Sequence, residues 1–345
     1  MTAGGDAIDT AAIAAWMSTL DIEVVGPVAF ARVGAGHSNL TFLAVDAAGS
    51  RWILRRPPHG ELLASAHDVA REHRILTALE GTAVPTPGIH GLCTDPAVTD
   101  APLMVMDYVD AYVIGDMAAA EAVPVKRRRQ IGASVASTLG LVHAIDLEAT
   151  GLDSLASHAP YAERQLRRWR RQWELSATRD LPLVADLADR LTAIVPVQRE
   201  VTLVHGDFHL LNVMTNRDDG KVVAVLDWEL CTLGDPLADL GSTLAYWTQA
   251  DDDPVIGFAG PTLEGFPSRA EFVDLYATAT GRDVTDVWFW YVFGLWKIAV
   301  ISEGVIRRAL DDPRNASAEG QVDLTIVDKL LDRADRVLRE FSATY

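Results

Sequence analysis

A cluster of polar residues in an apolar setting stands in the segment 203–214 (LVHGDFHLLNVM). It carries Asp207 and Asn212, and Asp227 follows fifteen residues after Asn212, behind a second strand-like run. The pattern predicts two loops, joined by a pair of strands, that present the three side chains at one point. Two carboxylates and an amide oxygen are hard ligands suited to Mg²⁺. A carboxylate beside a substrate hydroxyl can orient that group or accept its proton during phosphoryl transfer.

Two other interpretations of this cluster stay open. Asp and Asn side chains often satisfy the backbone of turns, so the segment could be a hydrogen-bonded loop. His205 and His209, four residues apart, could bind zinc, although the glutamate of H-E-x-x-H is missing and Gly206 is unfavourable in a helix. Further polar residues in register favour the phosphoryl-transfer interpretation.

The segments around these residues resemble the catalytic core of aminoglycoside phosphotransferases, a family with the protein-kinase-like fold. The matching pattern is His205-x-Asp207-x-x-x-x-Asn212 followed by Asp227, and the kinase catalytic loop has the same D-x-x-x-x-N spacing. The run 234–240 (GDPLADL) is similar to that family's segment after the metal aspartate. The resemblance covers most of the chain. It is strongest to bacterial proteins named after this activity and to kinase-like domains joined to acyl-CoA dehydrogenases.

The resemblance implies a role for each residue of the cluster. Asp207 is expected to be the catalytic base or to orient the acceptor hydroxyl, and Asn212 and Asp227 to hold Mg²⁺ that bridges the phosphates of ATP. Asp239 is expected to tie the catalytic loop to the helix below it. His205 is expected to orient the loop rather than to transfer protons.

The resemblance places the nucleotide in the first part of the chain. The turn 34–39 (GAGHSN) stands where the family has a hairpin that covers the phosphates, so Gly34, Gly36 and Ser38 are expected to lie against them. Glycine allows such a close backbone approach, and successive N–H groups can cradle an anion. Taken alone, the turn is equally well an ordinary hairpin.

Next along the chain, the resemblance implies a cation that binds phosphate and a carboxylate that holds this cation in place. Arg55 stands on a strand where the family usually has lysine, and Glu72 of the following helix is expected to hold it. Arginine can grip phosphate, but its fork is not equivalent to an ammonium, which puts the efficiency of ATP use in question. Arg56 is a rival that should point to the opposite face of a regular strand. Solvated positions for Arg55 and Glu72 are the alternative.

The segment 103–109 (LMVMDYV) is similar to the strand that leads into the kinase hinge. On that alignment Met106 is the gatekeeper, and the carbonyl of Asp107 and the N–H of Val109 bind the adenine edge. Backbone contacts tolerate many side chains, so an edge strand running into a linker explains the segment equally well.

The order of elements predicts an α+β, two-lobed, protein-kinase-like fold. Residues 1–109 form a nucleotide-binding lobe with a small antiparallel sheet and one inserted helix, 110–117 a hinge, and 118–345 a mainly helical lobe with a β-rich catalytic insertion. The predicted strands are 24–33, 40–45, 52–55, 89–93 and 103–109. The predicted helices are 6–20, 66–79, 125–145, 161–176, 183–194, 236–248, 269–280, 284–310 and 322–341.

The composition limits the partners. The 345 residues carry a formal net charge of −18, which disfavours sequence-independent binding of nucleic acid. Cys93 and Cys231 cannot build a disulfide framework or a cysteine zinc site. The N-terminus has no basic start of a secretory signal, and the apolar stretch 287–301 is short for a membrane span and contains Lys297. We therefore expect a buried helix there and a cytoplasmic protein without membrane or nucleic-acid partners.

The sequence thus predicts an ATP- and Mg²⁺-dependent kinase that transfers the γ-phosphoryl group to a hydroxyl of a small molecule. An aminoglycoside is one expected acceptor, because the acidic run 251–253 and Glu264 would suit a polycation. A hydroxyacyl-CoA or another small alcohol is the alternative acceptor. A nucleotide-binding module without catalysis is the alternative function. A protein kinase is disfavoured, because Asp227-Trp228-Glu229 stands in the place of D-F-G. The sequence assigns no oligomeric state.

Overall fold

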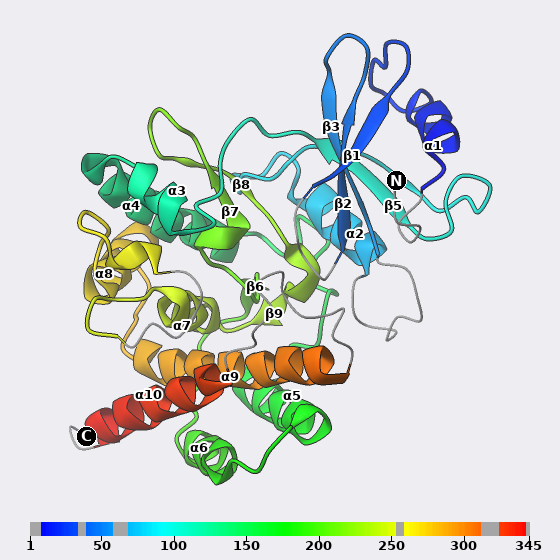
Figure 1. The fold of residues 1–345 in the computed structure, drawn as a ribbon. Helices are drawn as coiled ribbons and strands as arrows, with labels where there is room; N and C mark the ends of the chain where they lie inside the picture. Colours follow the sequence, from blue (N-terminus) through cyan, green and yellow to red (C-terminus); the bar gives the residue numbers. More distant parts are fainter. Residues whose placement is uncertain (1–7, 34–38, 58–67, 253–258, 312–323, 343–345) are drawn as a thin grey trace. The chain divides into compact units, whose positions relative to one another are not determined.

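The computed structural model describes residues 8–33, 39–57, 68–252, 259–311 and 324–342 (Figure 1). The chain divides into two compact units. The first comprises Met1–Asp110 together with Val223–Glu229, and the second comprises Ala111–Val222 together with Leu230–Tyr345. A short segment that follows much of the second unit in sequence therefore belongs to the first unit.

The first unit is built on a five-stranded antiparallel sheet with strand order β1-β2-β3-β5-β4 (Figure 1). Its strands are β1 (Ala29–Val33), β2 (Leu40–Val45), β3 (Arg51–Arg56), β4 (Ile89–Cys93) and β5 (Leu103–Asp107). The central strand β3 is paired on both sides, with Arg55 opposite Thr41 of β2 and opposite Met104 of β5. The backbone of Arg55 is thereby held in register from two directions.

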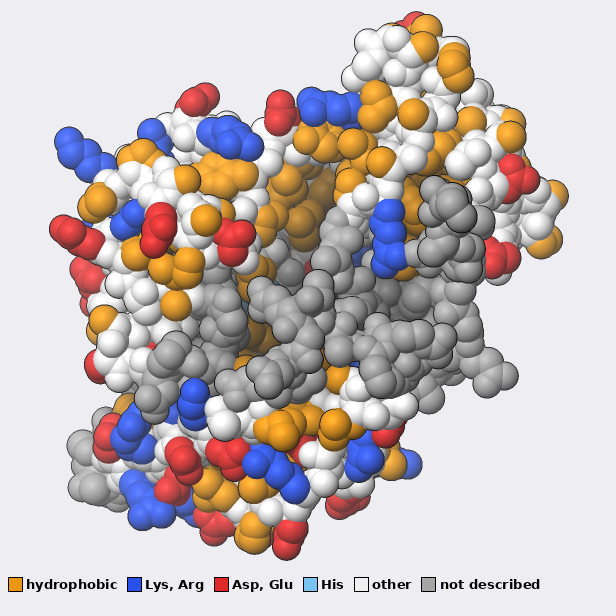
Figure 2. All heavy atoms as spheres, in the orientation of Figure 1, with side chains coloured by type: hydrophobic (Ala, Val, Ile, Leu, Met, Phe, Trp, Pro, Cys, Tyr) orange, Lys and Arg blue, Asp and Glu red, His pale blue; other side chains and the backbone are white. Residues whose placement is uncertain are grey.

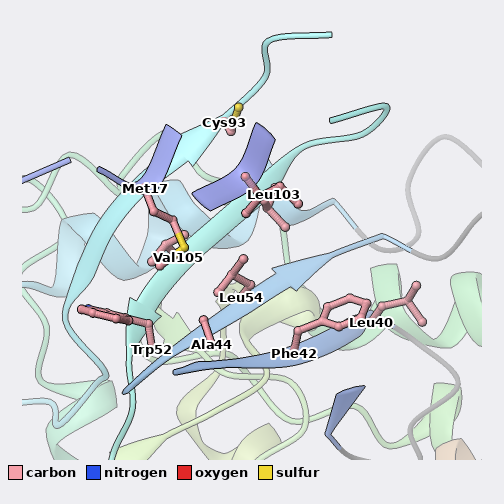
Figure 3. Close-up of a cluster of buried hydrophobic side chains, with 10 residues drawn as sticks. Met17, Leu40, Phe42, Ala44, Trp52, Leu54, Cys93, Leu103 and Val105 are labelled. Atoms are coloured by element: carbon pink, nitrogen blue, oxygen red, sulfur yellow. The ribbon is translucent and has the colours of Figure 1, made fainter. Parts of the chain in front are cut away.

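The two faces of this sheet contact different helices. One face is apolar, because alternate residues of a strand point the same way, and it packs on α1 (Thr10–Met17) through Ile13 and Met17 (Figure 3). Its buried strand residues are Leu40, Phe42, Ala44, Trp52, Leu54, Leu103 and Val105. Arg55 is out of phase with this set and points to the other face. There α2 (Val69–Leu79), capped by Asp68 through a 2.9 Å bond from Arg71 N, contacts β4 and β5.

The second unit is mainly helical, with short strands around one loop (Figure 1). Its helices are α3 (Met117–Ala122), α4 (Val125–His143), α5 (Tyr161–Ser176), α6 (Pro182–Ala193), α7 (Pro236–Tyr246), α8 (Arg269–Thr280), α9 (Val287–Asp311) and α10 (Thr325–Ser342). Strand β6 (Thr202–Val204) pairs with β9 (Thr232–Gly234), and β7 (Val213–Thr215) is followed by a turn and β8 (Val222–Val225). β8 begins in the second unit and continues into the first.

Helix α9 is the core of the second unit and packs against α5, α7 and α10. Its aromatic side chains are buried, among them Trp290, Phe293 and Trp296. By length and composition alone α9 is apolar enough to cross a membrane, but 83% of its most apolar window is buried inside the fold. This is the position of a core helix, and the predicted buried helix at 287–301 is confirmed.

Two glycines let α7 and α9 approach closely. A Cβ atom at Gly241 would lie 2.3 Å from the carbonyl carbon of Trp290, and one at Gly294 would lie 3.0 Å from the carbonyl oxygen of Gly241. The obstructing atoms are backbone, so a side chain at either position forces the helices apart.

We expect Gly241→Ala to lower the free energy of unfolding by about 3 kcal/mol, since overpacking against backbone cannot relax by a rotamer change. Gly304→Ala in α9 is the matched control, because its nearest neighbour would be the Cβ of Ser176 at 3.9 Å. Alanine is a better helix former, so the control should gain up to about 1 kcal/mol. Urea unfolding followed by circular dichroism measures both, and equal midpoints for the two variants would contradict this packing.

The predicted α+β class is confirmed, with a small antiparallel sheet, a helical remainder and short β insertions. Two elements were not predicted. Helix α3 has six residues, and its main signal is the cap by Asp116, which accepts from Ala119 N at 2.7 Å. Strand β9 has three residues, which is too short for an alternation pattern to appear.

Candidate active site

The loop 205–212 joins β6 to β7 in the second unit and carries Asp207 and Asn212. Gly206 has a φ of 87°, and a Cβ there would lie 2.6 Å from the carbonyl oxygen of Leu230. Only glycine fits this position without strain. Farther along, the carbonyl of Phe208 accepts a bond from Thr243 Oγ1 at 2.8 Å. The loop is therefore fixed to the helical core on both sides of Asp207.

Asp239 of α7 anchors the start of this loop. Its carboxylate accepts from the backbone N–H of His205 at 2.6 Å and from that of Gly206 at 2.8 Å. His143 Nε2 lies 3.3 Å from the same carboxylate. Burial would raise the pKa of Asp239, but His143, His205 and the Gly206 N–H outweigh it, and the pKa falls below its ordinary value. Asp239 thus connects the loop 205–212 to α7, as expected, by two charge-assisted hydrogen bonds.

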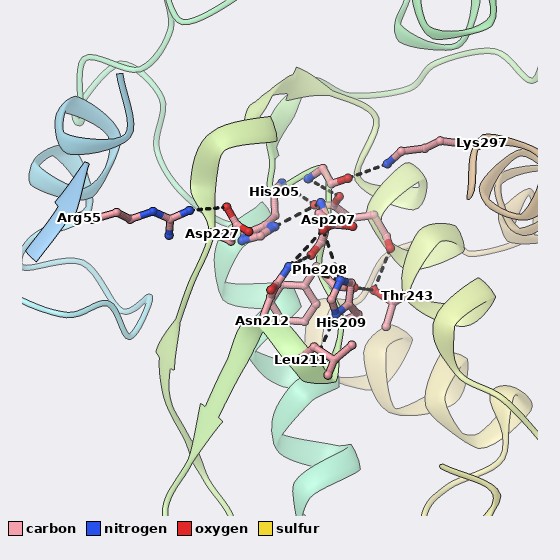
Figure 4. Close-up of polar contacts among 12 residues, drawn as sticks. Arg55, His205, Asp207, Phe208, His209, Leu211, Asn212, Asp227, Thr243 and Lys297 are labelled. Carbon is pink, nitrogen blue, oxygen red and sulfur yellow. Dashed lines mark hydrogen bonds and ion pairs between the residues drawn. The ribbon is translucent and has the colours of Figure 1, made fainter. Parts of the chain in front are cut away.

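The Asp207 carboxylate is surrounded by donors (Figure 4). Asn212 Nδ2 donates to its Oδ2 at 3.2 Å and to its backbone carbonyl at 2.9 Å, and His209 Nε2 lies 3.3 Å from Oδ2. The phenol of Tyr246 also bonds to it. Burial would raise the pKa of Asp207, but His209 and Lys297 outweigh this effect and hold it below its ordinary range. With 25% of its side chain exposed, Asp207 is an ionised carboxylate that a substrate can reach.

A second polar cluster lies in the first unit and centres on Arg55. Its Nη1 is 3.1 Å from Glu72 Oε1, and its Nη2 donates to Asp227 Oδ1 at 2.9 Å. Arg56 points to the opposite face, where it bonds to the carbonyl of Pro57 and to Asp100. Of the two arginines weighed from the sequence, Arg55 is therefore the one that contacts Glu72, as the alternation along a strand predicts.

Asp227 adopts a backbone conformation that is unusual for its type. Its φ is 66°, in the left-handed region, and it is the one non-glycine residue with positive φ in the part of the chain that the structure describes. The conformation costs on the order of 1 kcal/mol for an aspartate. The next residue, Trp228, is buried, and its Nε1 donates to the carbonyl of Val225 at 3.0 Å. Trp228 thus anchors the strained turn that aims Asp227 at Arg55.

Glu72 is buried, and its titration provides a test of this cluster. Burial raises the pKa of Glu72 to about 7, against the opposing effect of Arg55. In the nucleotide-free protein its stabilising contribution is fully present below its ordinary pKa and is lost as the pH rises through about 7. We expect the wild type to lose stability relative to Glu72→Gln between about pH 5 and about pH 8, as measured by urea unfolding. Parallel pH dependences of the two proteins would show that Glu72 is not perturbed.

The remaining predicted nucleotide residues are placed as follows. Gly34, Gly36 and Ser38 lie outside the described residues. Asp107 ends β5: its N–H donates to Gly88 O at 2.9 Å, and its carboxylate accepts from Gly88 N at 3.1 Å. Neither bond uses the Asp107 carbonyl expected to face adenine. Val109 lies two residues beyond the end of the strand.

The predicted metal ligands fall in different units, Asn212 in the second and Asp227 in the first. Because Asn212 Nδ2 faces Asp207, its Oδ1 lies on the far side of the amide, and Asp227 has a second oxygen besides the one bonded to Arg55. These hard oxygens fit Mg²⁺, which keeps waters and shares substrate phosphates. Among the described residues, no three His, Cys, Asp or Glu side chains are arranged to hold a metal, so the zinc interpretation of His205 and His209 has no third ligand there.

One residue of the acidic run 251–253 is engaged within the second unit. The side chain of Asp252 is 7% exposed and forms ion pairs with Arg269 and with Arg333, the latter at 2.7 Å. Asp253 lies outside the described residues. Elsewhere on the second unit, as Figure 2 shows over α10 and α6, acidic and basic side chains intermingle. Ion pairs such as Arg190 with Asp335 account for this pattern.

Sequence reasoning missed three residues next to the loop 205–212. Tyr246 bonds to Asp207, and its ring lies against that of His209 with centroids 4.3 Å apart and ring planes tilted by 47°. Lys297 donates to the Gly206 carbonyl at 2.6 Å, and His143 contacts Asp239. All three come from helices that are distant in sequence. Only Lys297 carries a signal, as a single charge inside an apolar stretch.

The fold and the two polar clusters define a class of enzyme. The model of the phosphotransferase enzyme family matches residues 29–273, more than two thirds of the chain, and the chain belongs to that family. An aminoglycoside phosphotransferase and a choline kinase are among the solved structures to which the chain is similar.

The chain is also similar to particular known proteins. Acyl-CoA dehydrogenase family member 10 from Mus musculus is 34% identical over 336 residues, which cover 94% of this chain and 31% of the mouse protein. The chain spans about a third of the length of the curated relatives it matches. The solved structure of a candidate aminoglycoside phosphotransferase from Ralstonia eutropha JMP134 is 29% identical, with a TM-score of 0.79. The match covers 96% of this chain and 99% of that one.

More distant solved structures share the fold. Choline kinase from Cryptosporidium parvum Iowa II is 12% identical with a TM-score of 0.63, over 92% of this chain and 90% of that one. The GDP complex of aminoglycoside 2'-phosphotransferase-IIIa is 14% identical with a TM-score of 0.59, over 93% of this chain and 94% of that one. The predicted kinase-like fold is confirmed.

Proposed function

We propose that this protein is an ATP- and Mg²⁺-dependent kinase that transfers the γ-phosphoryl group to a hydroxyl of a small molecule. The observation that carries the proposal is Asp207. Its carboxylate is ionised, partly exposed and fixed by Asn212 and His209. A carboxylate held in this way is suited to orient an acceptor hydroxyl.

In the proposed reaction the acceptor oxygen attacks the γ-phosphorus as the bond to the bridging oxygen of ADP breaks. The hydroxyl proton passes to Asp207. Because the pKa of Asp207 is low, this transfer is favourable only late, once the new P–O bond has made the hydroxyl strongly acidic. Asp207 therefore acts first by aligning the hydroxyl and only afterwards as the proton acceptor.

The nucleotide phosphates are assigned to Arg55 in this proposal. Glu72 and Asp227 fix its guanidinium from two sides, so little side-chain freedom is lost when it binds phosphate oxygens. Magnesium, when bound, neutralises phosphate charge, and Asn212 and Asp227 supply the oxygens that would hold it.

The acceptor is proposed at the level of an alcohol. Asp252, which would have suited an aminoglycoside, is occupied by Arg269 and Arg333. A hydroxyacyl-CoA and other small alcohols therefore stand beside aminoglycosides as acceptors to be tested. The rings of Tyr246 and His209, in contact with each other beside Asp207, provide an aromatic wall that suits a carbon-bound hydroxyl.

Transfer of label from γ-labelled ATP tests the proposal, with aminoglycosides, hydroxyacyl-CoAs and small alcohols as separate acceptor panels. We expect Mg²⁺-dependent label in one panel and none with Asp207→Ala. Thermal unfolding with ATP, with and without Mg²⁺, distinguishes the alternative. Stabilisation by Mg²⁺ and ATP without transfer to any acceptor would indicate a nucleotide-binding module, and stabilisation by neither would refute the kinase proposal.

A further inference from the structure

A lysine is buried in the most apolar helix of the protein. Lys297 of α9 has 7% of its surface exposed and lies between the buried residues Trp296 and Ile298. Burying an ammonium is expensive unless it is paired and hydrogen-bonded, and burial lowers the pKa of Lys297. Packing alone would be served better by methionine or leucine, so the contacts of the ammonium must account for the lysine.

The ammonium reaches the loop 205–212 immediately before the proposed catalytic carboxylate. Lys297 Nζ donates to the carbonyl oxygen of Gly206 at 2.6 Å (Figure 4). That carbonyl belongs to the peptide group joining Gly206 to Asp207. On the other side of the same peptide, Asp207 N–H donates to His205 Nδ1 at 3.3 Å. Both polar groups of the peptide that carries Asp207 are therefore held by side chains.

Lys297 and Asp239 bind different peptide groups of the loop. Asp239 binds the N–H groups of His205 and Gly206, which belong to the two preceding peptides, whereas Lys297 binds the last carbonyl before Asp207. Gly206 is in the left-handed region, and a glycine has no side chain whose packing would restrain its peptides. Without Lys297, the peptide that orients Asp207 loses the hydrogen bond to its carbonyl oxygen.

The charge of Lys297 also faces the site. Asp207 and Asp239 are the carboxylates that favour its charged form, Arg168 of α5 opposes it, and the ring of Trp169 lies 5.8 Å from Nζ. The other groups at Asp207 are His209, His205 and Tyr246. A charged donor makes a shorter and stronger hydrogen bond than a neutral one, so the ammonium holds the Gly206 carbonyl more firmly than an amide would.

We propose that Lys297 is a positioning residue for phosphoryl transfer, which orients the Gly206–Asp207 peptide. The inference rests on the proposed function, in which Asp207 aligns the acceptor hydroxyl. It assigns two separable contributions to one side chain, the hydrogen bond to Gly206 and the positive charge that strengthens this bond.

Two variants separate these effects. Lys297→Met removes both the donor and the charge while filling a similar volume, so the protein should remain folded. Lys297→Gln keeps a donor and removes the charge. Glu303→Gln is the matched control, because Glu303 is also buried in α9 but bonds to Thr178. Thermal unfolding verifies that each variant is folded.

The kinetic readout is the separate measurement of kcat and of KM for ATP. For Lys297→Met we expect kcat to fall about 10- to 100-fold with KM for ATP unchanged, because Asp207 then aligns the acceptor hydroxyl less well. Lys297→Gln, which keeps a neutral donor, should regain part of kcat. Glu303→Gln should change neither constant. A folded Lys297→Met with the kcat of the wild type would overturn the inference.

A second readout does not depend on turnover. In protein labelled with nitrogen-15 aspartate, the backbone amide signal of Asp207, assigned by its loss in Asp207→Asn, reports on the Gly206–Asp207 peptide. We expect this signal to shift or broaden in Lys297→Met and to stay in place in Glu303→Gln. An unchanged signal in Lys297→Met would overturn the inference whatever the activity. A shifted signal in a protein that phosphorylates no acceptor would support the inference and refute the proposed function alone.

Discussion

Asp207→Asn is expected to lower kcat for phosphoryl transfer by about 10³-fold, within the range for a group that aligns and deprotonates a hydroxyl. Asparagine keeps the size and one oxygen of the side chain but has neither the negative charge nor the ability to take the proton. KM for ATP should change little, because Asp207 is assigned to the acceptor and not to the nucleotide. Steady-state kinetics with the acceptor identified by the labelling panels measures both quantities.

Asp218→Asn is the matched control for this prediction. Asp218 is exposed in the turn after β7, in the same unit as Asp207. The control changes the net charge by the same amount and should keep the activity of the wild type. Retention of more than about a tenth of kcat in Asp207→Asn would mean that Asp207 is not the group that aligns the hydroxyl.

Arg55→Met is expected to reduce kcat/KM for ATP by about 10²- to 10³-fold, since a charge-assisted phosphate contact is lost and its two carboxylate partners remain. Asp227 would then face the phosphates with negative charge and no arginine beside it. Stabilisation of the protein against heat by Mg²⁺ and ATP should fall in parallel. Initial rates at varied ATP concentration and thermal unfolding measure the two effects.

Two further variants identify the cause of this loss in kcat/KM for ATP. Arg55→Lys keeps the charge, but one ammonium replaces a fork that pairs with two carboxylates, so we expect activity within about tenfold of the wild type. Arg51→Met removes a cation from the same face of β3, where Arg51 stacks on Tyr108, and should leave ATP use unchanged. Wild-type kcat/KM in Arg55→Met would remove Arg55 from the nucleotide site.

Much of the fold could be predicted because its elements are long and regularly patterned. The bounds of β2, β4, α5 and α8 match the predicted ranges, and each shows clear alternation, helical spacing or a capping signal. β1 begins at Ala29, five residues later than predicted, because an apolar run does not show which of its residues find a partner strand. Residues of α3 and β9 form short elements that only tertiary contacts define.

The site residues could be predicted where functional side chains lie close together in the sequence. Asp207 and Asn212 lie in one loop, and the contact of Arg55 with Glu72 follows from strand alternation and the helix that comes next. Tyr246 and Lys297 were not predicted, because a tyrosine or lysine in an apolar helix has no spacing relation to a loop far away in sequence. Their contacts with the loop depend on how α7 and α9 pack, which a local pattern does not contain.

The position of the segment Val223–Glu229 in the first unit has a consequence for synthesis on the ribosome. Amino acids are added from the N-terminus, so the first 110 residues emerge long before the segment that completes their unit. Until residue 229 has emerged, Arg55 lacks Asp227 and has only Glu72 as a partner. The first unit therefore cannot finish folding as a nascent N-terminal domain. Any fragment or fusion cut near Asp110 will separate Arg55 from one of its two carboxylates.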